Sequence, residues 1–228
     1  MKLTKLFAVG TLFLAAAGAV FAQSKRSETT VEDEYLTSIE DVIITELAAS
    51  PEYENKFLAL QYLENALNEG RTSPDMVSSL RNLAGEGVTT KARTNGRLMN
   101  NYPDIRKKAC ELLGQVGTED AKNTLVQIIA DDQEPMVVAA AVHSLGDIGL
   151  NENDEVVGAI EFMQRKYAAL NPSSSLALEI LFAYEKLADS VQDRGPMIES
   201  IAAIAANYRF ATTVRTKAYD LLRSLKAR

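Results

Sequence analysis

The sequence is poor in the residues that most often supply catalysis or covalent bracing. Its 228 residues include one cysteine, one histidine and no tryptophan. The lone Cys110 excludes an internal disulfide, and an exposed thiol would be a liability, so we expect Cys110 to be buried as a small apolar residue. The lone His143 would have to serve any Ser-His-Asp or Cys-His arrangement, and no motif surrounds it. We therefore interpret His143 as solvated or hydrogen-bonded.

Motifs that bind metals or phosphates are also missing. The sequence has no HExxH, no CxxC, no glycine-rich phosphate loop and no calcium-loop spacing. The polar cluster at residues 151–155 lacks the alternating acidic order of a calcium loop, and Asn153 and Asp154 fit better as helix caps. We expect no catalytic residues, no metal site and no cofactor.

Long apolar runs are absent after residue 22, where the longest is Met136–Val142. Residues 1–22 have the layout of a secretory signal peptide, with two early lysines, an uncharged and mainly apolar segment Leu6–Phe21, and a cleavage site between Ala22 and Gln23. The alternative is an uncleaved anchor, which the shortness of this segment disfavours. We expect a periplasmic or secreted protein without stable membrane insertion.

Basic charge is scarce in the N-terminal part of the chain. Without residues 1–22, 22 basic residues face 31 acidic ones, a net charge of −9 that disfavours nucleic acid as a partner. Residues 28–54 contain nine acids and no Lys or Arg, whereas residues 209–228 contain six bases and one acid. Solvated faces explain most of this gradient. Head-to-tail association through opposite charges is the other possibility.

What the sequence does contain is a repeat. Five residue identities recur at an offset of 32, and they pair Pro103 with Pro135, Ala109 with Ala141, Leu113 with Leu145, Gly114 with Gly146, and Gly117 with Gly149. Apolar residues follow a helical template at relative positions 0, 4, 7, 8 and 11, starting at residues 105, 176 and 214. The copy that starts at residue 137 fits four of the five positions, with Ser144 in the fifth. Each such helix carries an apolar stripe along one side. A single pair of helices cannot bury the stripes of both, but pairs stacked side by side can.

Asp104-Ile105-Arg106, followed by Ala109, Leu113-Gly114 and Gly117, resembles the second helix of a HEAT repeat. Thr213-Val214-Arg215 repeats part of this pattern, whereas Val138 replaces the arginine in the intervening copy. The chain thus resembles a secreted bacterial protein of the HEAT-repeat, armadillo-like family. The tetratricopeptide repeat is the main competitor, but its signature is missing.

The resemblance implies an all-α, right-handed α-solenoid of about five antiparallel helix pairs. It also implies that the second helices line the concave face, which would place there Lys107, Glu111, His143, Glu179, Lys186 and Lys217. We expect a flexible acidic tail at 23–34, a capping pair at 35–73 and HEAT-like repeats at 74–228. The repeats are expected to divide into 74–117, 118–149, 150–189 and 195–228. The first helix, from about Tyr35 to Ala49, should carry an apolar face made of Tyr35, Ile39, Val42, Ile43 and Leu47.

One long irregular loop, residues 86–101, interrupts the helices, and long loops in compact proteins are often functional. Between Gly87 and Pro103 there are three bases and no acid. The candidate protein-binding residues are Lys91, Arg93, Arg97, Asn100, Asn101, Tyr102, Arg106 and Lys107. Their expected partner is a protein with an acidic or carboxylate-bearing surface. Alternatively, the loop is pinned across the solenoid edge by Arg97, Leu98, Met99 and Tyr102, or the bases pair with the acidic N-terminal helices.

These features favour a secreted, non-catalytic scaffold for protein–protein interaction in the cell envelope. The alternative is a secreted enzyme, a hydrolase that uses carboxylates on the concave face.

Overall fold

A computed structural model of the protein describes residues 31–227. The expected signal peptide and the first part of the acidic tail, residues 23–30, lie outside the described residues. The first four helices are α1 (Val31–Ala49), α2 (Tyr53–Asn68), α3 (Pro74–Ala84) and α4 (Pro103–Val116). They are followed by α5 (Glu119–Asp131), α6 (Pro135–Ile148), the short 3-10 helix η1 (Glu152–Asp154), α7 (Glu155–Leu170), α8 (Ser174–Leu187), α9 (Gly195–Ala206) and α10 (Thr212–Ala227).

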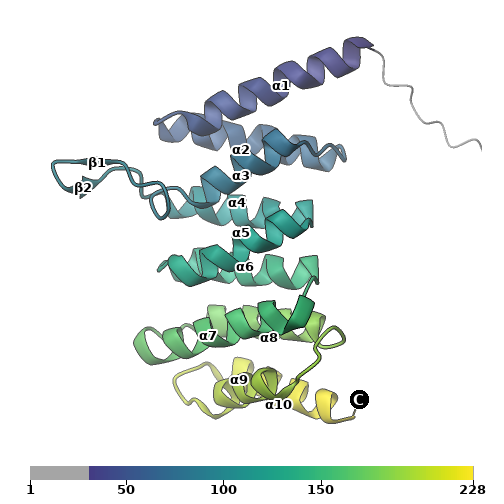
Figure 1. The fold of residues 1–228 in the computed structure, drawn as a ribbon. Helices are drawn as coiled ribbons and strands as arrows, with labels where there is room; N and C mark the ends of the chain where they lie inside the picture. The colour runs from purple at the N-terminus through teal and green to yellow at the C-terminus, as the bar shows by residue number, and fades with distance from the viewer. Residues whose placement is uncertain (1–30, 228) are drawn as a thin grey trace, which may run out of the picture.

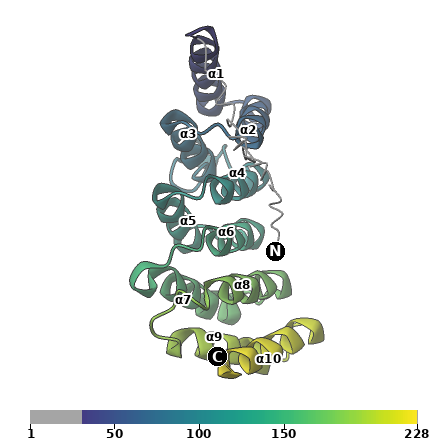
Figure 2. The same cartoon turned by 90° about the vertical axis from the view of Figure 1, so that its right-hand side faces the viewer.

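The helices form two layers that run the length of the molecule (Figures 1 and 2). Each odd-numbered helix packs against the even-numbered helix that follows it, and each layer is continued by contacts such as α4 with α6 and α6 with α8. Figure 2 shows the layer of α3, α5, α7 and α9 beside the layer of α4, α6, α8 and α10. The predicted all-α solenoid is confirmed.

Prolines, capping side chains and glycines set the ends of the central helices. Helices α3, α4 and α6 begin with proline, whose missing N–H is not needed at the first helical position. The predicted cap Ser73 accepts a hydrogen bond from the Met76 amide at 3.2 Å. Gly117 and Gly149 end α4 and α6 with φ of +68° and +71°, a conformation that favours glycine. The repeated glycine 32 residues apart is therefore a repeated helix end.

The repeated Leu-Gly pair inside α4 and α6 has a different cause, which is close helix packing. A Cβ placed on Gly114 would lie 2.7 Å from Cβ of Ser144 on α6, and one on Gly146 would lie 2.8 Å from Cα of Ala183 on α8. Side chains larger than hydrogen do not fit at these crossings. The two glycines let α4, α6 and α8 approach one another along one layer.

The predicted stripe of the central helices forms the core. Ile105, Ala109 and Leu113 of α4 are fully buried, as are their counterparts on α6. Cys110 is buried as predicted, and burial raises the pKa of its thiol well above the ordinary value. Burial of this kind is worth about 25 cal/mol per Å² of apolar surface, so the stack of stripes is the main stabilising feature.

The first helix differs from the prediction in its start and in its orientation. It begins at Val31, four residues before Tyr35, and it buries Ile44 and Ala48. Of the expected apolar face, Tyr35, Ile39, Val42 and Ile43 are exposed, whereas Leu47 is half-buried against the core. Among the described residues, α1 at the end of the stack packs against α2 and α3, and no described helix covers its other side.

The predicted irregular loop contains a small β-hairpin instead. Strands β1 (Arg93–Thr94) and β2 (Arg97–Leu98) pair antiparallel. The turn between them is Asn95-Gly96, with φ of +52° and +80°. Asn-Gly is the strongest short-range hairpin signal because both turn positions require positive φ. The sequence therefore contained this information, and the interpretation as irregular was incomplete.

Candidate functional site

The hairpin projects from the side of the helical stack (Figure 1). Its bases Lys91, Arg93 and Arg97 are exposed, as is Met99 beside them. The Arg93 guanidinium donates a hydrogen bond to the Gly96 carbonyl at 2.9 Å, within the hairpin itself. The tip therefore presents three cationic side chains to solvent, on a segment that contains no acid between Gly87 and Pro103.

The base of the hairpin is fixed by a buried polar cluster. The Asn100 amide nitrogen donates to Glu86 Oε1 at 2.6 Å and to the Thr90 carbonyl at 2.7 Å, while its Oδ1 accepts from the Ala92 amide at 2.9 Å. The second oxygen of Glu86 pairs with Lys56 Nζ of α2 at 2.9 Å. Asn100 is thus an internal anchor that joins both arms of the hairpin to the helical stack.

Arg106 is also internal, with only 1% of its surface exposed. Its Nε and Nη2 bind the two carboxylate oxygens of Asp132 at 2.7 and 3.3 Å, and its Nη1 donates to the Glu86 carbonyl at 3.2 Å and to Asn101 Oδ1 at 2.9 Å. This bidentate pair satisfies the charge of the guanidinium inside the fold. Arg106 ties the hairpin base on one side to the α5–α6 turn on the other.

Asp132 is held by further contacts from the next repeats. Its carboxylate accepts from the Glu134 amide at 2.9 Å, and its carbonyl accepts from the Tyr167 hydroxyl at 3.1 Å. Burial, followed by the charge of Asp132, raises the pKa of Tyr167 to about 12. The hairpin is therefore connected through Arg106 and Asp132 as far as α7.

The eight candidate binding residues thus fall into two groups. The structure leaves Lys91, Arg93 and Arg97 open to solvent. The other five lie at or below the hairpin base, where Asn100 and Arg106 are buried and Tyr102 packs edge-on against Tyr53 at a centroid distance of 5.3 Å. Of the four residues expected to pin the loop, Tyr102 packs against the stack, whereas Arg97 and Met99 are exposed. The base is held instead by Asn100 and Arg106. Pairing with the N-terminal helices also occurs, because Lys108 binds Glu64 of α2 at 2.6 Å.

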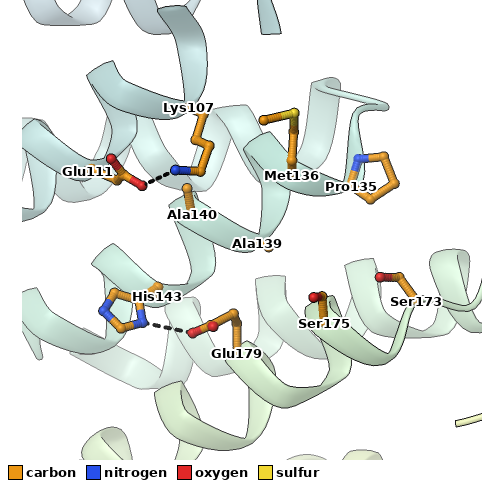
Figure 3. A pocket seen from close by; sticks show the side chains of 10 residues that line it. All are labelled: Lys107, Glu111, Pro135, Met136, Ala139, Ala140, His143, Ser173, Ser175 and Glu179. Carbon is orange, nitrogen blue, oxygen red and sulfur yellow. Dashed lines mark hydrogen bonds and ion pairs between the residues drawn. The ribbon is translucent and has the colours of Figure 1, made fainter. Parts of the chain in front are cut away.

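A second surface feature is a groove of about 560 Å³ across α4, α6 and α8 (Figure 3). Four of the six residues expected on the second-helix face line it, namely Lys107, Glu111, His143 and Glu179. Lys107 pairs with Glu111, and His143 Nδ1 lies 2.7 Å from Glu179 Oε2. The carboxylates that the hydrolase alternative would use therefore each have a cationic or imidazole partner along this face.

The polar cluster before α7 forms hydrogen bonds with backbone amides of α7 and of the loop after α8. Asp154 occupies the predicted cap position of α7, but its side chain accepts no hydrogen bond from that helix, and Asn153 lies within η1. The Val156 and Val157 amides donate instead to Asn151 Oδ1 at 3.1 and 3.2 Å. Asp154 accepts from the amides of residues 193 and 192 at 2.7 and 2.9 Å, which lowers its pKa. Within residues 31–227 no group of three or more His, Cys, Asp or Glu side chains is arranged to hold a metal ion.

Comparison with known proteins gives one match. The family of HEAT repeats matches residues 96–164, from the hairpin turn into α7. Searches of curated proteins and of solved structures found no match. Among the described helices, none is both long and apolar enough to cross a membrane. The match supports a HEAT-repeat family for the segment that contains Asp104–Gly149, and HEAT repeats suggest a protein-interaction scaffold.

Proposed function

We propose that the protein is a secreted, non-catalytic HEAT-repeat scaffold of the cell envelope, and that its hairpin tip binds a partner protein with an acidic or carboxylate-bearing surface. Export rests on the sequence of residues 1–22, with cleavage between Ala22 and Gln23 and a periplasmic or extracellular location. The proposal assigns no catalytic role to the residues that line the groove. The single observation that carries it is the hairpin tip with its three exposed cations.

The tip suits recognition of carboxylates for a chemical reason. Arg93 and Arg97 carry planar guanidinium groups that bind carboxylates with two parallel hydrogen bonds, and Lys91 adds a mobile point charge. The exported chain has a net charge of −9, and the acids of its N-terminal helices repel an acidic partner that the tip attracts. Such charge patterns select the orientation of docking and raise the association rate more than the affinity.

The rigid base supports binding by a separate argument. Asn100, Glu86 and Arg106 hold both arms of the hairpin in internal hydrogen bonds, and the Asn-Gly turn fixes its shape. A preformed binding element loses less conformational freedom on association than a flexible loop does. The base therefore presents the tip in one arrangement.

The test begins with crosslinking in the native host, followed by mass spectrometry to identify the partner. Replacing Lys91, Arg93 and Arg97 together with alanine should abolish capture of that partner. The free energy of unfolding should change by no more than about 0.5 kcal/mol per exposed site. A control with Lys91→Arg, Arg93→Lys and Arg97→Lys keeps all three charges and should retain most of the capture.

Capture that survives the alanine variant would show that the tip is not the docking surface. If capture is lost in both variants, binding depends on the geometry of the arginine guanidinium groups and not on positive charge alone. Loss of folding, measured by circular dichroism, is not expected because none of the three side chains is buried.

A further inference from the structure

The outer face of α1 is apolar and exposed. Five large apolar side chains lie along the helix at spacings of one, three and four residues, namely Tyr35, Leu36, Ile39, Val42 and Ile43. All five are exposed, with Tyr35 66% and Val42 59% exposed. Positions at these spacings share one side of a helix. The helix therefore buries Ile44 and Ala48 against its neighbours and turns a second, larger apolar stripe away from them.

This arrangement is unusual for the end of a solenoid. Terminal repeats have no neighbour on one side, so their outer face is ordinarily polar. Contiguous exposed apolar patches on soluble proteins generally mark contact surfaces. Helix α1 lies at the end of the stack (Figure 1), and its exposed stripe offers an apolar surface on which a further helix could pack.

The charge around the α1 stripe is acidic. Residues 35–54 contain five acids and no base. Glu40 is paired with Arg71 at 2.7 Å, whereas Glu46 is exposed and follows the stripe three residues after Ile43. A partner that covers the stripe must therefore combine apolar atoms with positive charge. Two α1 faces placed together would bring these acids against one another, which disfavours a symmetric contact.

The opposite end of the molecule has that combination. Helix α10 buries Val214, Ala218, Leu221 and Leu225, and its other side carries Tyr219, Arg223 and Lys226, all exposed. Residues 207–226 contain five bases and one acid. Tyr219 is 50% exposed, and two further apolar side chains of the last repeat, Ile198 on α9 and Tyr208 just after it, are exposed as well. The methylene stems of Arg and Lys can cover apolar surface while their charges stay hydrated.

We propose that the α1 face of one copy docks on the α10 face of a second copy, head to tail. Tyr219 and the stems of Arg223 and Lys226 would cover the α1 stripe, and their charges would face Glu46 and the neighbouring acids. This contact is heterologous, because two different surfaces meet, so each dimer keeps one free face at either end and can add further copies. The assembly continues the two-layer stack of helices from one chain into the next.

The test measures molecular mass by analytical ultracentrifugation of the purified protein. The weight-average mass of the unmodified chain should rise with protein concentration. It should fall when the salt concentration increases, because the electrostatic attraction between the two faces is screened over roughly 3 Å at 1 M salt. Two variants block one face each. Ile39→Gln with Val42→Gln removes the apolar contact on α1, and Arg223→Glu with Lys226→Glu reverses the charge on α10.

Each blocked variant should be monomeric alone, with association weakened at least roughly tenfold. An equimolar mixture of the two should form a 1:1 dimer and nothing larger, because it contains one intact α1 face and one intact α10 face. A control with Lys91→Glu and Arg93→Glu makes the same charge change on the hairpin and should assemble like the unmodified chain. Circular dichroism and thermal unfolding check that every variant is folded.

Three results would overturn the proposal. An unmodified chain that stays monomeric at all concentrations would show that the α1 stripe does not dock on a second copy. Dimers of the α10 variant alone would indicate a symmetric contact between α1 faces. Loss of assembly in the hairpin control would place the contact at the hairpin.

Discussion

Helices α4 and α1 both carry an apolar stripe, but the two stripes differ in their exposure to solvent. In α4 the stripe of Ile105, Ala109 and Leu113 is fully buried, whereas Ile39 and Val42 in α1 are exposed. Helix α4 has packing partners in α2, α3, α5 and α6, whereas within residues 31–227 the helices that pack against α1 are α2 and α3. The period of a stripe identifies a helix, but the neighbours of the helix decide whether the stripe is core or surface.

The largest effect is expected from a charge in the α4 stripe. Leu113→Asp places a carboxylate at a fully buried position without a partner, which should lower the free energy of unfolding by more than about 3 kcal/mol. Denaturant unfolding followed by circular dichroism measures this loss. An unchanged melting temperature would refute the register of the repeat.

A slightly smaller loss is expected when Arg106 loses its partner. Asp132→Ala leaves the guanidinium buried and uncompensated, at a cost of about 3 kcal/mol. Asp131→Ala is the matched control, because Asp131 is exposed and its loss should change stability by no more than about 0.5 kcal/mol. Equal effects of the two substitutions in denaturant unfolding would show that the Arg106–Asp132 pair does not stabilise the fold.

Two glycines allow a comparison within the helices. Gly146→Ala would place a Cβ 2.8 Å from Cα of Ala183, so we expect a loss of about 1–3 kcal/mol from overpacking. Gly158 in α7 has no atom within 4 Å of the added Cβ, so Gly158→Ala should stabilise the protein by about 0.5–1 kcal/mol through helix propensity. Thermal unfolding of both variants checks the opposite signs. The same sign for both would show that α6 and α8 are not in close contact at Gly146.

Much of the fold could be predicted because it is encoded locally. The Ser73-Pro74 start, the repeated glycine helix ends and the stripe around Leu113 all depend on residues within one helix or its cap. The hairpin was also encoded locally, in Asn95-Gly96, and could have been recognised from that dipeptide.

The internal role of Arg106 could not be predicted from its own neighbourhood, because its partner Asp132 is 26 residues away in the next repeat. One signal did point to burial. The residue 32 positions later is Val138, which is fully buried, so the two copies share a core position. The direction of the α1 stripe depends on a missing neighbour, and a helical period contains no information about that.

The most direct test of the contrast between α4 and α1 is the stability of Val42→Asp, measured by denaturant unfolding at a concentration where the chain is monomeric. The charge enters an exposed stripe, so the free energy of unfolding should stay within about 0.5 kcal/mol of the unmodified protein. A loss near the 3 kcal/mol expected for Leu113→Asp would contradict the account, because it would show that the outer face of α1 is part of the core.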